Sequence, residues 1–443
     1  MFNKQRERDG RSTEQYRHKA DELDEVEAII KSGDSDLLRI VFETGQFNDI
    51  NAMKSFLGPS LLMIACQTGF IDCVKVLLDY KNGSKTQYDC LLLYACLSGK
   101  VEMVRFIIEN GFEINDTAIM DVFETEVVIK NTEIITILID YIKIIDLPFL
   151  FWASHAGNVT IVQSLLERGA NPNSMYCSTE FDALFGATKK GYYEVVKLLL
   201  TWDAIDKRPS QDRLVGALVR AAYNGHIDIA LYIFEYGIEV TAAALTSALR
   251  AAVENNHLQI ADYLIAKGVE YNIPTMNDAC LLTYPCIIGS MVRLLLTRGA
   301  DPNAVDHHGC CPLKAALHYA DIVNLVLEAG ADPNLHFADG STALIDVIKS
   351  FEKNARVILH LLFQHGADPN LAHAHTAETP LMAAARGHPR LALVVVGVLL
   401  KHGADVTQLN IAGKCFLDMI CAVPGMSAMV ELYRQDTRPS SVL

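Results

Sequence analysis

The stretch LLTRGADPN at residues 295–303 is one copy of a phrase that recurs along this chain of 443 residues. Close copies are LLERGANPN at 165–173, VLEAGADPN at 326–334, LFQHGADPN at 362–370 and LLKHGADVT at 399–407. Weaker copies are FEYGIEVT at 234–241 and LIAKGVEYN at 264–272. A period of about 30–40 residues predicts stacked supersecondary units rather than one globular core.

The residues around each phrase predict two helices per unit. Ile161, Val162, Leu165 and Leu166 have the spacing of one apolar helix face. The glycine that follows is typical of a helix end, and the Asp-Pro or Asn-Pro after it cannot continue a helix. A shorter helix ending at a second glycine comes first, as in ASHAGN at 153–158. The predicted unit is therefore helix, tight turn, helix, glycine and extended loop.

At these residues the sequence resembles the ankyrin-repeat family. The family pattern TPLxxAAxxGHxxIVxxLLxxGADPN is nearly complete in TPLMAAARGH at 379–388 with the GAD that follows, and partial in GCCPLKAAL at 309–317. The resemblance covers residues 22–434. It implies an all-α solenoid of about 12–13 stacked helix-turn-helix units.

We expect three segments along the chain. Residues 1–20 are charged and polar without an apolar period, which predicts disorder. Residues 21–434 would hold the repeats, and 435–443 would form a flexible tail. The unit at 117–145 has lost both turn glycines, so we expect it to be the least stable part of the stack. Four of its residues keep the apolar spacing: Ile134, Ile135, Leu138 and Ile139.

Charge and cysteine content narrow the classes of function. The net charge is −15; six basic and three acidic residues give +3 in residues 1–20, which leaves −18 on the other 423. A field of this sign disfavours nucleic acid and favours a basic protein or peptide partner. The eleven scattered cysteines indicate a reducing compartment rather than a disulfide scaffold. No apolar run is long enough for a membrane span.

We find no motif for catalysis, a cofactor or a metal. The sequence lacks the GxxxxGK[ST], HExxH, GxSxG and paired CxxC signatures, so we expect no enzyme and no cofactor. Cys310 and Cys311 beside His307 and His308 are poorly spaced to hold a metal. Three histidines match a family position where the imidazole bonds neighbouring backbone, which implies a structural role: His226, His257 and His388.

The resemblance also implies where a partner would bind. The expected positions are the extended loops between repeats, called fingers, and the two residues before the glycine of each tight turn between the two helices of a repeat, called the inner turn. Residues 189–223 are the richest stretch there, because aromatic side chains supply most interface hot spots. Tyr192 and Tyr193 are interpreted as packing between repeats. The predicted partner-binding residues are Lys189, Lys190, Trp202, Tyr223, Asn224 and Glu254.

We interpret the chain as a monomeric, non-catalytic scaffold or adaptor in the cytoplasm, with the nucleus left open. One alternative is a substrate-recruiting subunit of a ubiquitin ligase, although no SOCS-box or F-box segment is recognisable. A second is a bacterial effector that binds host proteins in the host cytosol. A third is a fragment of a larger protein with a catalytic domain elsewhere.

The last residues suggest a separate interaction, in which the C-terminal tail of this chain is itself the ligand. Ser441, Val442 and Leu443 place a hydroxyl third from the end and an apolar residue last, which fits capture by a PDZ-type domain. A frayed tail without function is the alternative.

Overall fold

The computed structural model describes residues 24–44, 60–80, 90–112, 114–145, 148–175, 182–202, 210–237, 241–269, 281–283, 288–306, 308–350, 354–386 and 389–420. Within these ranges the chain is helical, and its only extended pairings are two isolated bridges. The chain divides into two compact units, the N-terminal unit (1–217) and the C-terminal unit (218–443).

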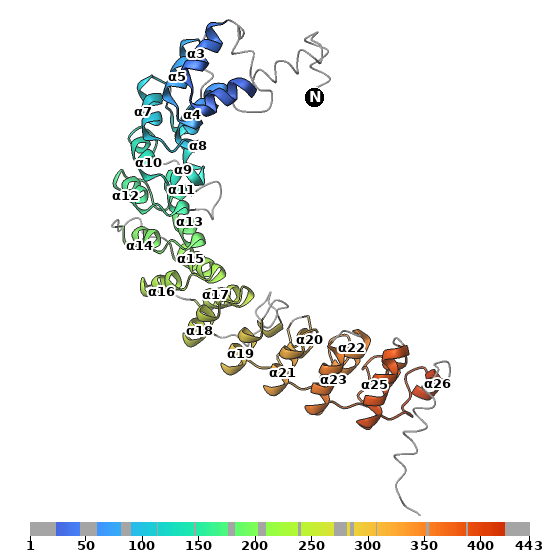
Figure 1. Cartoon of the computed structure of the whole chain (residues 1–443). Helices are drawn as coiled ribbons and strands as arrows, with labels where there is room; N and C mark the ends of the chain where they lie inside the picture. The colour runs from blue at the N-terminus through green and yellow to red at the C-terminus, as the bar shows by residue number, and fades with distance from the viewer. Residues whose placement is uncertain are drawn as a thin grey trace, which may run out of the picture. The chain divides into compact units, whose positions relative to one another are not determined.

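The N-terminal unit is built from helix pairs. A helix ending at residue 32 pairs with α3 (Ser35–Glu43), followed by α4 (Leu61–Thr68) with α5 (Ile71–Asp79) and α6 (Leu91–Leu97) with α7 (Val101–Glu109). Then come α8 (Asp116–Phe123), α9 (Glu126–Ile129) and α10 (Thr132–Ile139), α11 (Phe149–Ala156) with α12 (Val159–Glu167), and α13 (Ala183–Lys190) with α14 (Tyr193–Thr201). In this unit the second helices α5, α7, α10, α12 and α14 form one layer, and α4, α11 and α13 form the other (Figure 1).

The later repeats continue the same order. The pairs are α15 (Gln211–Asn224) with α16 (Ile227–Glu235), α17 (Ala242–Glu254) with α18 (Leu258–Ala266), and the 3₁₀ helix η3 (Leu281–Thr283) with α19 (Gly289–Thr297). Next are α20 (Pro312–Ala316) with α21 (Ala320–Glu328), α22 (Ala343–Ser350) with α23 (Ala355–Gln364), α24 (Pro380–Ala385) with α25 (Pro389–Lys401), and α26 (Phe416–Ile420). The predicted all-α stack of helix pairs is confirmed.

Local sequence explains where these helices begin and what they bury. Polar side chains accept a backbone N–H at several first turns, which satisfies a donor that the helix itself cannot. The four apolar residues predicted on the face of α10 are all buried, as are the four on α12. Helix pairs therefore close over a shared apolar face, as the spacing predicts.

Two described residues other than glycine adopt the left-handed conformation. Asn256, with φ 59°, stands at an inner turn where other repeats have glycine. Its Oδ1 accepts the N–H of Ile288 at 3.1 Å. Ala377, with φ 50°, stands in a finger at the place that Gly340 (φ 81°) takes one repeat earlier. A Cβ disfavours this conformation, and asparagine tolerates it better than alanine does.

Asparagine side chains join the fingers of the C-terminal unit. The Nδ2 of Asn334 donates to the carbonyl of Gly366 at 3.0 Å, and its Oδ1 accepts the N–H of Asp368 at 2.7 Å. Two other asparagines make the same pair of bonds to the next repeat: Asn303 and Asn370. We call these three residues the asparagine ladder. Each carboxamide therefore ties one repeat to the one that follows.

The repeat at 116–144 closes without glycine. Its first helix breaks between α8 and α9, and Lys130 stands where the neighbouring repeats have an inner-turn glycine. The carboxylate of Asp116 accepts the N–H groups of Lys143 (2.9 Å) and Ile144 (3.1 Å) in the loop that follows α10. A side chain thus replaces the turn that glycine forms elsewhere. That this repeat is the least stable stays a prediction.

Several expectations fall outside the described residues. These are the disordered segment 1–20, the tail 435–443 with Ser441, Val442 and Leu443, and the side chains of His307 and His388. They stay predictions.

Candidate functional site

The residue just before the second helix of a repeat packs over the inner turn of the preceding repeat. A Cβ added to Gly157 would lie 2.6 Å from the ring of Tyr192, so the tyrosine packs against this turn. His257 covers Gly225 in the same way, and its Nε2 donates to the carbonyl of Tyr223 at 3.0 Å. The structural role predicted for His257 is confirmed, and Tyr192 lies where a packing residue is expected.

A group of charged and apolar side chains gathers on the first helices of the N-terminal unit. Both α9 and α13 contact α11, so three neighbouring helices contribute. We call this group the α9–α13 surface; it comprises Glu126, Val127, Lys130, Trp152, His155, Lys189 and Lys190.

Glu126 is the carboxylate in the α9–α13 surface and has two cationic neighbours. Its Oε1 lies 3.1 Å from the Nζ of Lys130 and 3.9 Å from the Nζ of Lys190. The hydrogen bond from Lys130, followed by the charges of Lys130 and Lys190, lowers the pKa of the Glu126 carboxyl. Two lysine side chains of this surface, Lys130 and Lys190, therefore share one carboxylate oxygen.

His155 links these charges to an aromatic cluster. Its ring stacks on Phe151 at 5.8 Å between centroids and meets Trp152 edge-on at 5.8 Å. Burial, and then the charge of Lys190, lowers the pKa of His155 below its usual value. The imidazole is therefore neutral at pH 7 and adds ring surface rather than charge.

Val127 is the most exposed large apolar side chain among the described residues, at 78%. Matching positions in the next two repeats, three residues before the inner turn, hold Ser154 and Thr188, which are fully buried. The break between α8 and α9 turns Val127 outward, because helical position decides which face a side chain takes. The repeat that lost its glycines thus exposes an apolar side chain next to Glu126, the carboxylate that pairs with the lysines.

Of the predicted partner-binding residues, two belong to this surface. Lys189 and Lys190 lie exposed in the last turn of α13. Trp202 is half-buried and directly follows α14. The nine residues of α14 place Trp202 roughly 13 Å along the second-helix layer from the start of that helix. The structure therefore does not gather Trp202 with the two lysines.

The other three predicted residues lie in the C-terminal unit. Tyr223 is 48% exposed in the last turn of α15. Asn224 donates to the carbonyl of Arg220 at 2.9 Å, and Glu254 lies 3.9 Å from the Nε of Arg250. Tyr223 and Glu254 occupy matching places in successive repeats, two residues before the inner turn. The predicted set is thus divided between the two units.

Sequence reasoning missed the contribution of α9. Glu126, Val127 and Lys130 were hidden because the repeat has no inner glycine to mark its register. Asn131 gives a usable signal, since its side chain caps α10 as that of Asn158 caps α12. Aligning these two asparagines places Lys130 at the inner turn and Val127 three residues before it.

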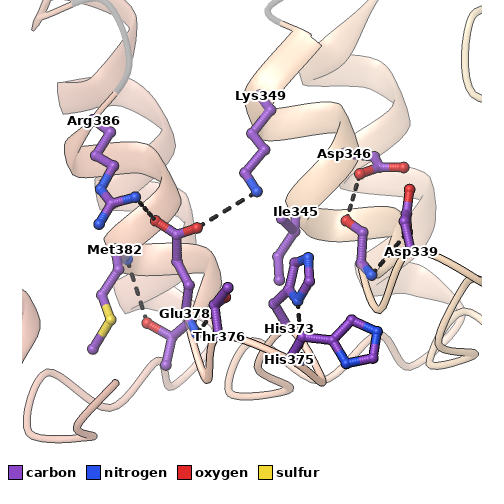
Figure 2. A network of polar contacts seen from close by, with 12 residues as sticks. Asp339, Ile345, Asp346, Lys349, His373, His375, Thr376, Glu378, Met382 and Arg386 are labelled. Carbon is purple, nitrogen blue, oxygen red and sulfur yellow. Dashed lines mark hydrogen bonds and ion pairs between the residues drawn. The ribbon is translucent and has the colours of Figure 1, made fainter. Parts of the chain in front are cut away.

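A second polar cluster pins a finger of the C-terminal unit. Figure 2 shows Glu378 between Lys349 and Arg386. The carboxylate oxygens of Glu378 lie 3.5 Å from the Nζ of Lys349 and 3.1 Å from the Nη1 of Arg386. Glu378 is only 6% exposed, and its N–H donates to Thr376 Oγ1 at 3.3 Å. Both cations already share this one buried carboxylate. The cluster therefore holds the finger against α22 and α24 and offers little charge to a partner.

Other kinds of site find no support in the described residues. No group of three or more His, Cys, Asp or Glu side chains there could hold a metal ion. Burial raises the pKa of the Cys66 and Cys96 thiols to about 12, so both stay protonated at neutral pH and are poor nucleophiles. None of the described helices combines the length and apolar character of a membrane span.

Comparison with known proteins gives matches along most of the sequence. The family model for ankyrin repeats in three copies matches residues 26–118, 127–211, 150–244, 184–275 and 249–337, and the single ankyrin-repeat model matches 378–411. No curated protein sequence matches the chain.

Two solved structures are similar over about half of the chain. The human ASB11 ankyrin repeat domain is 21% identical, with a TM-score of 0.42, and the match covers 50% of this chain and 98% of that one. An ankyrin repeat domain from Acinetobacter baumannii AYE is 26% identical, with a TM-score of 0.38, and the match covers 42% and 98%.

Proposed function

Because the chain belongs to the ankyrin-repeat family, we propose that it is a non-catalytic scaffold or adaptor that binds protein partners through its first helices and fingers. Ankyrin-repeat domains are generally protein-binding modules. The proposal places the protein in a reducing compartment, the cytoplasm or the nucleus, because Cys66 and Cys96 are buried thiols.

The α9–α13 surface is the observation that carries this proposal. Stacked pairs bury their apolar faces against one another, so the side chains left outward on the first helices are available to a partner. Val127 and Lys190 are such side chains, and Tyr223 is another in the C-terminal unit. The half-buried Trp152 adds aromatic area to this surface, and tryptophan is among the residues enriched at binding hot spots.

Affinity capture with matched baits tests the proposal. The baits are the unchanged chain, the first-helix variants Lys190→Ala and Tyr223→Ala, and the second-helix variants Lys197→Ala and Val357→Ala. Lys197 on α14 and Val357 on α23 are exposed like their counterparts but lie in the other layer. Trp202→Ala is a separate arm that asks whether binding extends to the end of α14.

We expect the second-helix variants to capture the same proteins as the unchanged chain, and the first-helix variants to lose some of them. Circular dichroism of each bait checks that it is folded. Identical captured sets for all folded baits would show that the first-helix layer does not select partners.

A further inference from the structure

We propose that the α9–α13 surface binds an acidic protein segment that carries apolar side chains. This inference rests on the proposed function and adds the chemistry of the partner. It differs from the basic partner that the net charge of the whole chain favours.

The local charge of this surface is opposite in sign to that of the chain. Two of its lysines, Lys130 and Lys190, share a single carboxylate, Glu126, whereas the whole chain carries −15. Lys130 and Lys190 converge on the same oxygen of Glu126, so both ammonium groups are held on this surface. Fixed positive charges on an otherwise negative molecule attract and orient carboxylates of a partner.

The apolar part of the surface gives the partner a second requirement. Val127 is exposed and follows Glu126 directly in α9, and Trp152 is half-buried against Phe151 and His155. Covering this apolar area removes it from water, which favours a segment with apolar side chains between its acidic ones. A segment with charge alone would leave Val127 exposed.

Nucleic acid is the competing polyanion, and the structure favours it less. Recognition of a phosphate backbone needs a basic footprint that follows the strand. Here the lysines come from α13 and from the one residue that follows α9, and the chain as a whole carries −15. Phosphates also provide no partner for Val127. We therefore commit to a protein segment.

Fluorescence anisotropy on the full chain tests the inference with three labelled probes. These are a short peptide of alternating glutamate and leucine, the matched peptide of lysine and leucine, and single-stranded DNA of similar length. The variants are Lys190→Glu and Val127→Ser on the surface. Lys197→Glu is the matched control, because it makes the same charge change on the exposed side of α14.

We expect saturable binding of the acidic peptide alone, weakening as salt is raised. Lys190→Glu should weaken it at least about tenfold, as reversal of a charge in a complementary pair does. Lys197→Glu should stay within about twofold, since that charge lies outside the contact. Val127→Ser should weaken binding of the peptide without changing its salt dependence. Lys190→Ala gives a smaller loss in the same direction and avoids a new carboxylate beside Glu126.

Equal weakening by Lys190→Glu and Lys197→Glu would overturn the assignment, as would DNA that binds as tightly as the acidic peptide. If the unchanged chain did not bind the acidic peptide, the inference about the partner would be wrong. The adaptor role would still hold if affinity capture depended on Tyr223. Capture that ignored every first-helix variant would remove the adaptor role itself. The two experiments therefore fail in distinguishable ways.

Discussion

The repeat at 116–144 and the repeats between Gly299 and Gly403 form similar helix pairs with different turn chemistry. In the latter, glycines with φ from 86° to 96° end the second helices and the asparagine ladder joins the fingers. In the former, Lys130 replaces an inner glycine and the carboxylate of Asp116 holds the loop after α10. The buried apolar face is common to both, so it determines the helix pair, and the turns can be closed in more than one way.

The same comparison shows where a function can arise in a repeated fold. A repeat that keeps the glycine pattern also keeps small buried residues near its inner turn, such as Ser154 and Thr188. The repeat that lost the pattern exposes Val127 and Lys130 instead. Departures from local rules concentrate at functional sites in many proteins, and here the departure supplies part of the candidate site.

Removing the carboxylate of Asp116 should have the largest effect on stability. Asp116→Ala leaves two backbone N–H groups without their charged acceptor, so we expect a loss of about 2 kcal/mol in the free energy of unfolding. Asp121→Ala, on the exposed side of the same helix, is the control and should change it by less than about 0.5 kcal/mol. Urea unfolding measures both. Equal midpoints for the two variants would mean that the cap at Asp116 does not hold this repeat.

The asparagine ladder should respond somewhat less. Asn334→Ala removes two neutral hydrogen bonds at an exposed site, for which we expect about 1.5 kcal/mol. Asn324→Ala removes one bond within α21, to Glu328, and should cost only about 0.3 kcal/mol. The comparison uses the same residue change in the same repeat. A cost for Asn334→Ala no greater than that for Asn324→Ala would contradict a role in joining repeats.

Hydrogen exchange compares the two regions within one molecule. We expect amides of α10 to exchange at least about tenfold faster than amides of α21, a difference of about 1.4 kcal/mol in opening free energy. The reason is that stability in a stacked array is a sum of local and neighbour terms, and the α8–α10 repeat has no glycine-closed turn. Uniform protection across 116–144 and 291–334 would show that Asp116 and the capping asparagines compensate fully.

A glycine at residue 377 should stabilise the protein by about 1 kcal/mol, because Ala377 holds its Cβ in the left-handed region. Ala374→Gly in the same loop is the control; it should be neutral or destabilising by up to about 0.5 kcal/mol, since there the change only adds freedom to the unfolded chain. Thermal unfolding of the two variants checks the sign. A lower Tm for Ala377→Gly than for the unchanged chain would contradict strain at this position.

The parts of the fold that follow from local chemistry were predictable from the sequence. Glycines such as Gly157 mark left-handed turns, apolar spacing marks the buried face of α10, and the family position of His257 gave its backbone bond. The break between α8 and α9 was not predictable, because neither glycine nor proline marks residues 124 and 125. Without that break nothing in the sequence distinguishes Val127 from a buried residue.

The charged cluster around Glu378 shows a second limit. Its cations come from Lys349, in the preceding repeat, and Arg386, one helix later. Such pairs depend on how repeats stack, so spacing along the chain does not indicate them. The same reason explains why Trp202, notable as an aromatic residue in the sequence, lies apart from Lys189 and Lys190 once the helix layers are formed.

The asparagine ladder gives the stack a direction. Each carboxamide belongs to one repeat and bonds only the backbone of the repeat after it: Asn303 reaches residues 330 and 332, and Asn334 reaches 366 and 368. Deleting a repeat on the C-terminal side therefore leaves the carboxamide of its predecessor without these two bonds, whereas deletion on the N-terminal side removes them from a backbone carbonyl and N–H of the next repeat. Stepwise truncation should thus expose a side-chain carboxamide at the C-terminal end of the ladder and backbone groups at its N-terminal end, so the two ends are not equivalent.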